Sequence, residues 1–136
     1  IQFTDYLSHI DIIHRDTIIK LDQLIVEKFG EDNRFIWEGI FWGGTNQRII
    51  GYGELDMKRK DGATWFSVGL AIQKNYYSLY INAVEDNMYL AKKYADTLGK
   101  VKIGSSSISF TTLDKLNLET LATLLEIAHK QWKSSL

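Results

Sequence analysis

Apolar side chains recur at intervals of three and four positions in the first quarter of the chain, which is the spacing of a helix that buries one face. These positions are Ile18, Leu21, Leu24, Ile25 and Phe29. Gly30 follows them, and glycine commonly ends a helix. We therefore expect a helix that begins near Asp11 or Arg15 and ends before Gly30, with a shorter helical turn over residues 5–9 in front of it.

The same spacing returns twice in the second half of the chain. Leu90, Tyr94 and Leu98 predict a helix that Gly99 stops. Asn117 is a favourable N-cap for a final helix. The apolar stripe of that helix consists of Leu118, Leu121, Leu125, Ala128 and Trp132.

Between these helical regions the spacing changes, and aromatic and β-branched side chains gather in short runs. Four strands are predicted, at residues 35–42, 49–57, 64–72 and 76–82. The connection Lys58-Arg59-Lys60-Asp61-Gly62 contains an Asp-Gly pair that favours a hairpin, and Gln73-Lys74-Asn75 is equally typical of a turn. Such short connections favour antiparallel neighbours, because parallel strands need crossovers of about a dozen residues or more.

Two further short strands are expected at residues 101–103 and 108–110. The resulting order is helix, four strands, helix, two short strands, helix. It predicts an α+β fold with a single mainly antiparallel sheet, made of a four-strand meander plus two short strands, and three helices packed on one face. No repeat or linker divides the chain, so residues 1–136 are expected to form a single domain.

Composition removes several classes of function. The chain has 136 residues, of which 45% are hydrophobic and 24% charged, and these are ordinary globular values. It contains no cysteine, which excludes disulfides and thiolate chemistry. A net charge of −1 argues against a nucleic-acid partner. No signal peptide or membrane-length apolar run is visible, so we expect a cytoplasmic protein without membrane contact. The sequence leaves its oligomeric state open.

Several short motifs occur in an order that resembles a known family. They are Trp42-Gly43-Gly44, Gly51-Tyr52-Gly53, Val68-Gly69-Leu70-Ala71-Ile72-Gln73-Lys74, Ser78-Leu79-Tyr80-Ile81, Leu98-Gly99-Lys100-Val101-Lys102-Ile103-Gly104 and Leu113-Asp114-Lys115-Leu116-Asn117-Leu118 with Leu121. Over roughly residues 37–128 this set resembles the YdhG-like family, a domain of unknown function. The resemblance implies a curved antiparallel sheet, and some members are called frataxin-like intracellular iron chaperones.

The chain departs from the family pattern in two places. Many members have Pro-Arg-Lys where this chain has Ile72-Gln73-Lys74, and many have Lys-Ser-Cys-Leu where it has Ser105-Ser106-Ser107-Ile108. Roles that depend on that additional cation or on that cysteine are therefore not carried over to this chain.

The most site-like segment lies around the late glycine. Lys100 and Lys102 alternate along a predicted strand and are expected to point to one face. Gly104 allows close backbone approach, and Ser105, Ser106 and Ser107 supply hydroxyls and amides that suit a carboxylate or a phosphate. Lys74 lies at a turn that we expect to be nearby. The alternative is a polar hairpin with solvated lysines.

Aromatic residues form the second candidate site. Trp37, Trp42, Tyr52, Trp65 and Tyr80 crowd into the predicted sheet and can line an apolar pocket whose ligand they orient through N–H or O–H groups. Trp42-Gly43-Gly44 is the expected rim of that pocket. The alternative is that the rings fill the core between sheet and helices.

Metal binding is a third possibility. Asp5, His9, Asp11, His14 and Asp16 lie close together near the start, and Glu85-Asp86 adds an acidic pair. Carboxylates of this kind suit weak binding of ferrous iron, whereas no closed zinc set is present. Solvated surface carboxylates are the alternative, and we assign no metal ligand.

No catalytic constellation is recognisable. The serines after Gly104 do not form a G-x-S-x-G elbow, and Gly51-Tyr52-Gly53 lacks the third glycine of a dinucleotide fingerprint. The sequence therefore predicts a non-enzymatic binding domain for a small anionic ligand or a peptide, without a cofactor. The alternatives are an iron chaperone that uses surface carboxylates, and a structural or partner-binding protein with an exposed apolar patch.

Overall fold

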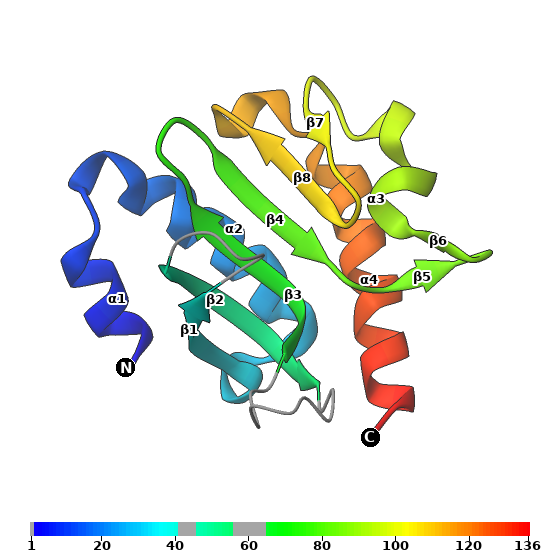
Figure 1. The fold of residues 1–136 in the computed structure, drawn as a ribbon, viewed down its shortest axis with the longest axis horizontal. Coiled ribbons are helices and arrows are strands. Elements are labelled where there is room, and N and C mark those ends of the chain that lie inside the picture. The colour runs from blue at the N-terminus through cyan, green and yellow to red at the C-terminus, as the bar shows by residue number, and fades with distance from the viewer. Residues whose placement is uncertain (1, 41–45, 56–64) are drawn as a thin grey trace.

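The computed structural model describes residues 2–40, 46–55 and 65–136, and two long helices cover one face of its six-stranded sheet (Figure 1). Two predicted features lie outside the described residues, namely the Trp42-Gly43-Gly44 rim and the Lys58-Arg59-Lys60-Asp61-Gly62 connection.

Helices occupy both ends of the chain and a short stretch in its middle. The α-helices are α1 (Phe3–His9), α2 (Ile12–Phe29), α3 (Leu90–Lys93) and α4 (Leu118–Ser134), and the 3-10 helices are η1 (Glu31–Asn33), η2 (Ala95–Thr97) and η3 (Leu113–Lys115). The predicted limits of α2 are confirmed. The Asp11 carboxylate accepts a hydrogen bond from the Ile13 amide at its start, and Gly30 ends it with a positive φ of 81°.

The strands form one large sheet and one small hairpin. They are β1 (Arg34–Ile40), β2 (Asn46–Leu55), β3 (Trp65–Ile72), β4 (Tyr77–Ile81), β5 (Val84–Glu85), β6 (Met88–Tyr89), β7 (Lys102–Ile103) and β8 (Ser107–Phe110). The large sheet has the order β1-β2-β3-β4-β8-β7, and its described strand pairs are antiparallel. The predicted α+β class and four-strand meander are therefore confirmed.

Two helical predictions need correction. The helix expected over Leu90, Tyr94 and Leu98 is one turn of α3 followed by η2, although Gly99 does end the segment with a φ of 105°. Leu118 is 38% exposed and lies outside the buried stripe of α4, because it is the first residue of the helix after its Asn117 cap.

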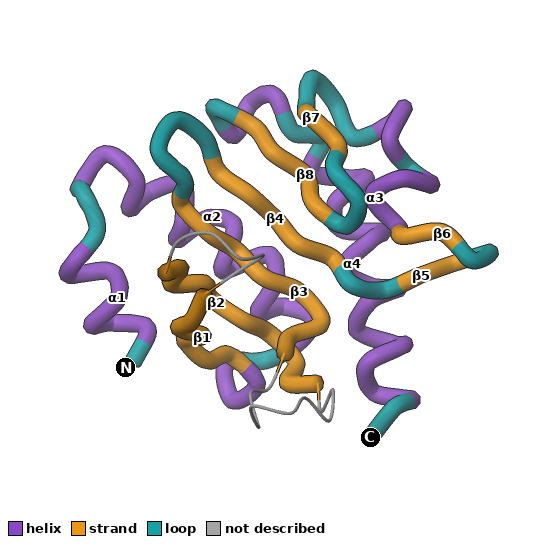
Figure 2. The backbone as a smooth tube through the Cα atoms, in the orientation of Figure 1, coloured by secondary structure: helices purple, strands orange, loops and turns teal. Residues whose placement is uncertain are grey.

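The β5–β6 hairpin was not expected from the sequence. Asp86 and Asn87 both have positive φ angles, 54° and 64°, as a two-residue type I′ turn requires. The hairpin extends away from the large sheet beside α4 (Figure 2). Asp86 belongs to the acidic pair expected from the sequence, and its backbone also makes the turn.

The main core lies between the sheet and the helices. Alternate strand residues point into it, among them Ile50, Tyr52, Val68, Leu70 and Leu79, and they pack against α2 and α4. Glycine positions, small side chains and a second set of aromatic rings are left for the opposite face of the sheet. Neither of the two long helices described covers that face, and we call it the helix-free face.

Candidate functional site

A row of small side chains crosses the helix-free face at the β7 end of the sheet. Lys102 pairs with Ser109, Ser109 pairs with Ser78, and Ser78 pairs with Ala71 on four adjacent strands. Phe110 and the neighbours of these residues in β8 and β4 are buried in the main core, so the serines point the other way. Of these residues, Lys102 and Ser109 line a hollow on this face, whereas Ser78 and Ala71 are buried and do not line it.

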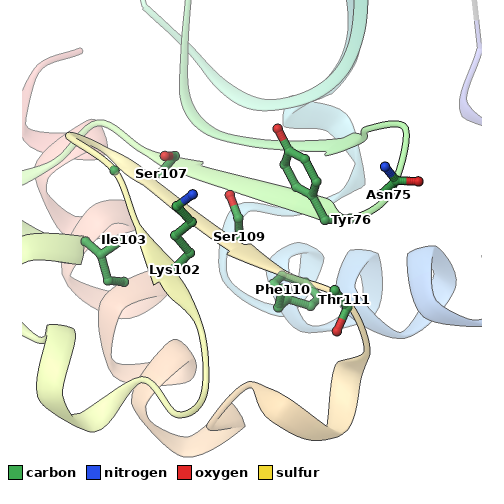
Figure 3. Close-up of a pocket in the computed structure, with 9 residues that line it drawn as sticks. Asn75, Tyr76, Lys102, Ile103, Ser107, Ser109, Phe110 and Thr111 are labelled. Carbon is green, nitrogen blue, oxygen red and sulfur yellow. The ribbon is translucent and has the colours of Figure 1, made fainter.

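The hollow has a volume of about 460 Å³ (Figure 3). Its lining residues come from the β3–β4 turn and from the β7–β8 hairpin. They are Asn75, Tyr76, Lys102, Ile103, Gly104, Ser107, Ser109, Phe110 and Thr111. Among these described residues Lys102 is the one cation, and none is an aspartate, glutamate or histidine. The described lining therefore supplies one positive charge, four hydroxyls (Ser107, Ser109, Thr111 and the Tyr76 phenol) and the Asn75 side-chain amide.

The β7–β8 loop is shaped by its glycine. The Gly104 N–H donates to the Ser107 carbonyl over 2.9 Å, which closes the hairpin. A Cβ on residue 104 would overlap the Ser107 hydroxyl, so only glycine leaves that hydroxyl in its present place. The Ser106 carbonyl accepts from the Ile81 amide over 2.9 Å, which ties the loop to β4. The Gly104 amide is thus used within the hairpin and is not a donor for a bound anion.

The structure brings together part of the first predicted site. Lys102, Gly104 and Ser107 line the hollow, whereas Lys100, Ser105, Ser106 and Lys74 are not among its lining residues. β7 contains only Lys102–Ile103, so the expectation that Lys100 alternates with Lys102 along one strand is wrong. Lys100 precedes the strand, and its amide donates to the Lys115 carbonyl.

Six of the nine described lining residues were not among the site residues predicted from the sequence. Ser109 could have been found from the hairpin alone, because it is two positions after Ser107 and therefore shares its face. Asn75 and Tyr76 could not, since they join the hollow only because β8 pairs with β4. That pairing connects segments about 30 residues apart, and no local pattern encodes it.

The second predicted site is a packed cluster of rings on the same face. Trp37 meets Trp65 edge to face with ring centroids 5.2 Å apart, and Trp65 stacks on Phe66 at 4.3 Å. Phe66 continues the cluster to Tyr80, 6.3 Å away. Trp37 is only 7% exposed and Phe66 is fully buried. Among the described residues these rings pack against each other on the helix-free face, and not in the core between sheet and helices, where the alternative interpretation placed them.

Glycines allow two of the rings on this face to lie close to the backbone. Gly51 and Gly69 are paired on β2 and β3, and a Cβ on either would collide with a ring. The Phe35 ring lies over Gly51, and the Phe66 ring lies over Gly69. Backbone without side chains forms a shelf here, and aromatic rings cover it. The Gly51 of the Gly51-Tyr52-Gly53 motif is therefore a packing position rather than part of a nucleotide fingerprint.

Tyr52 does not belong to this cluster, which corrects the sequence-based grouping. It lies on the helix side of the sheet, where its hydroxyl donates to Asp22 Oδ1 over 2.7 Å. Asp22 is also paired with Arg34, whose Nη1 is 2.7 Å from Oδ2. Burial, together with the neighbouring Asp22 carboxylate, holds the pKa of Tyr52 well above its usual range. Both oxygens of the buried carboxylate are thus satisfied.

A smaller hollow of about 250 Å³ lies between α1 and the start of β1. Its lining includes Arg34, but that guanidinium is already bound to Asp22 and lies 4.0 Å from the Phe3 ring centroid. Glu31 adds a negative charge to the same hollow. An anion there would face Arg34, which is already paired with Asp22, and would be repelled by the Glu31 carboxylate. This hollow is therefore a poorer anion site than the one beside Lys102.

Three of the residues proposed for metal binding make separate local contacts. Asp11 caps α2, His9 Nδ1 lies 2.7 Å from the Asp5 carbonyl, and His14 Nδ1 lies 2.6 Å from the Tyr77 hydroxyl. Over residues 2–40, 46–55 and 65–136, no group of three His, Asp or Glu side chains is arranged to hold a metal ion. The iron alternative gains no support from these residues and stays a prediction.

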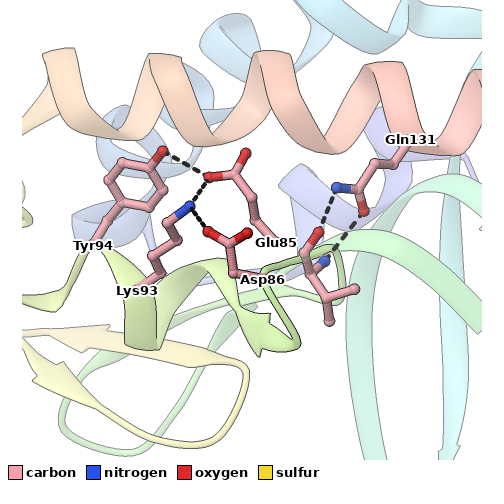
Figure 4. Close-up of polar contacts among 6 residues, drawn as sticks. Glu85, Asp86, Lys93, Tyr94 and Gln131 are labelled. Atoms are coloured by element: carbon pink, nitrogen blue, oxygen red, sulfur yellow. Dashed lines mark hydrogen bonds and ion pairs between the residues drawn. The ribbon is translucent and has the colours of Figure 1, made fainter.

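Glu85 and Asp86 both pair with one lysine (Figure 4). Lys93 pairs with both carboxylates, and the Tyr94 hydroxyl donates to Glu85 over 3.1 Å. Hydrogen bonds from Lys93 hold the pKa of both carboxyls below their usual range, and Tyr94 lowers that of Glu85 further. The network fixes the β5–β6 hairpin to α3.

Gln131 of α4 holds the same hairpin from the other side. Its Oε1 accepts from the Val84 amide over 3.2 Å, and its Nε2 donates to the Val84 carbonyl over 2.5 Å (Figure 4). One side-chain amide therefore satisfies both backbone groups of Val84, in the manner of a neighbouring strand.

No protein-family model matches the chain, and no curated protein or solved structure is significantly similar to it. The resemblance to the YdhG-like family therefore stays a prediction. Of the helices that the structure describes, none combines the length and the apolar character needed to cross a bilayer.

Proposed function

We propose that this protein is a non-enzymatic binding domain that takes a small anionic ligand in the hollow beside Lys102. The observation that carries the proposal is the convergence of the Lys102 ammonium with the Ser107 and Ser109 hydroxyls on one depression of the sheet (Figure 3). A cation together with neutral donors is the combination that binds an anion in proteins.

The size of the hollow favours a small ligand over a peptide. Ligand sites of about 300–1,000 Å³ are typical of small molecules. The value of about 460 Å³ falls in the lower part of that range. A peptide would need a longer groove, and the described lining ends at the β3–β4 turn and at the β7–β8 loop.

The lining also supports binding rather than catalysis. General acid–base chemistry and serine nucleophiles need a base such as histidine or a carboxylate within hydrogen-bond reach. The described lining residues supply neither of these groups to Ser107 or Ser109. A cytoplasmic location belongs to the same proposal.

A thermal-shift screen of small anions tests the proposal, with Lys102→Met against Lys100→Met. Both substitutions remove one positive charge, and the two lysines are two positions apart, but only Lys102 lines the hollow. A ligand at 100 times its Kd raises the free energy of unfolding by about 2.7 kcal/mol. We expect Lys102→Met to abolish most of that gain and Lys100→Met to keep it. The proposal would be contradicted if both variants lost this gain equally, or if neither variant lost it.

A further inference from the structure

The number of charges in the hollow limits the charge of its ligand. Lys102 is the one cation among the described lining residues, and Lys100 and Lys74 lie outside the lining. A second negative charge on the ligand would meet no second cation among these residues. A monoanion is therefore the better match than a phosphate dianion.

The backbone of the β7–β8 loop also favours a monoanion over a phosphate dianion. Proteins that bind phosphate without several cations use a series of free amides, at a helix N-terminus or in a nest. Here the Gly104 amide donates to the Ser107 carbonyl and closes the hairpin, so this amide is not a donor for an anion. The other donors of the described lining are hydroxyls, the Asn75 side-chain amide and Lys102, and a carboxylate accepts one or two hydrogen bonds from such groups at each oxygen.

The far side of the hollow is formed in part by an aromatic ring. Tyr76 lines it with a side chain that is 44% exposed, whereas Phe110 and Ile103 pack toward the main core. In Figure 3 the Lys102 side chain and the Tyr76 ring lie on either side of Ser109. A ligand bound to Lys102 through one end would reach the Tyr76 ring with the other end, and a flat apolar group packs well on such a ring.

We infer that the ligand belongs to the monocarboxylates that carry an aromatic or similarly flat apolar body. Its carboxylate binds Lys102 and the Ser107 and Ser109 hydroxyls, and its body lies against Tyr76. This inference rests on the proposed function, because it assigns a chemical class to the ligand of the same hollow.

Calorimetric titration of the whole protein with four probes tests the monocarboxylate inference separately from the proposed function. The probes are benzoate, benzamide, acetate and phenylphosphonate. We expect benzoate to bind at least about tenfold more tightly than benzamide, since a hydrogen bond to a charged group contributes 1.5–3 kcal/mol. Acetate, which lacks the flat body, is expected to bind about 2- to 12-fold more weakly than benzoate, the factor for an aromatic contact. Phenylphosphonate is expected to bind no more tightly than benzoate.

Two variants distinguish a failure of the monocarboxylate inference from a failure of the proposed function. Tyr76→Ala should weaken benzoate 2- to 12-fold and leave acetate unchanged, because only benzoate has a body that reaches the ring. Tighter binding of phenylphosphonate than of benzoate, lost in Lys102→Met, would overturn the monocarboxylate inference and leave the proposed function intact. An equal effect of Tyr76→Ala on acetate and benzoate would overturn the role of the flat body. Binding that Lys102→Met does not weaken would overturn the proposed function and the inference together.

Discussion

Ser107 of β8 and Tyr80 of β4 occupy paired positions, so the wall of the hollow and the edge of the aromatic cluster meet within one row of the sheet. The row continues from Tyr80 to Gly69 and from Gly69 to Gly51, where the rings begin to cover the backbone. The helix-free face is therefore divided in two. Rings fill it over the glycines, and small side chains leave it open beside Lys102.

The loop glycine should matter for binding through the serine that it accommodates. In Gly104→Ala the new Cβ displaces the Ser107 hydroxyl, which can rotate away at little cost in stability. Because one hydrogen bond contributes about 0.5–1.5 kcal/mol, we expect benzoate to bind about 2- to 12-fold more weakly, as in Ser107→Ala. Calorimetry on both variants measures this.

The variant that carries both Gly104→Ala and Ser107→Ala is the control for this prediction. Once Ser107 is alanine, Gly104→Ala has no hydroxyl to displace and should change the affinity little further. Additive losses from the two substitutions would show that Gly104 acts on the ligand by another route.

The glycine shelf should be intolerant of even one methyl group. Gly69→Ala would push the buried Phe66 ring off the sheet, and overpacking of this kind costs about 1–3 kcal/mol. Urea denaturation should show this loss in the wild-type background. In a Phe66→Leu background the cost should be smaller, because the ring in contact with residue 69 is gone. A cost that is the same in both backgrounds would mean that the ring is not the cause.

Alkaline pH should destabilise the protein through a buried phenol. Burial raises the pKa of Tyr6 to about 12, although the charge of Arg48 acts in the opposite direction. The unfolded chain releases this proton near pH 10, whereas the folded protein holds it, so stability is full below about pH 10 and is lost as pH rises toward about 12. Tyr6→Phe removes this titration. The variant should lose less free energy of unfolding over that range, and a slope equal to that of the wild type would refute the assignment.

Gln131 should control how firmly the β5–β6 hairpin is held. Gln131→Leu keeps the size of the side chain but removes both hydrogen bonds to Val84. Hydrogen exchange at the Val84 amide should accelerate about 2- to 12-fold, the factor for one lost hydrogen bond. Lys130→Leu is the matched control, since Lys130 is exposed and 3.5 Å from Glu126, away from the hairpin. Equal acceleration in both variants would argue against the Gln131 contact.

Sequence periodicity was sufficient for the parts of the fold whose signals are local. The Asp11 cap and Gly30 mark the limits of α2, and alternating strand residues with short turns predict the meander. The β5–β6 hairpin escaped because its strands have two residues each, too few to show a period. The signal available in the sequence was the Asp86-Asn87 pair, because both residue types tolerate the positive φ angles of this turn.

Which face a strand residue occupies was harder to predict. Alternation shows that Tyr52 shares a face with Ile50, but only the register with β1, in which Trp37 pairs with Ile49, shows that this is not the tryptophan face. The hollow depends on the pairing of β8 with β4, which is likewise not encoded locally. For that reason Lys102 could be proposed from the sequence, whereas its partner across the hollow, Tyr76, could not.

The most direct test of the central claim is an NMR titration of the isotope-labelled protein with benzoate, read at each backbone amide. We expect saturable shifts at Asn75, Tyr76, Lys102, Gly104, Ser107 and Ser109, all lining the hollow, and their loss in Lys102→Met but not in Lys100→Met. Shifts centred instead on Phe3, Arg34 and Ile36 at the smaller hollow, or none at any concentration, would contradict it.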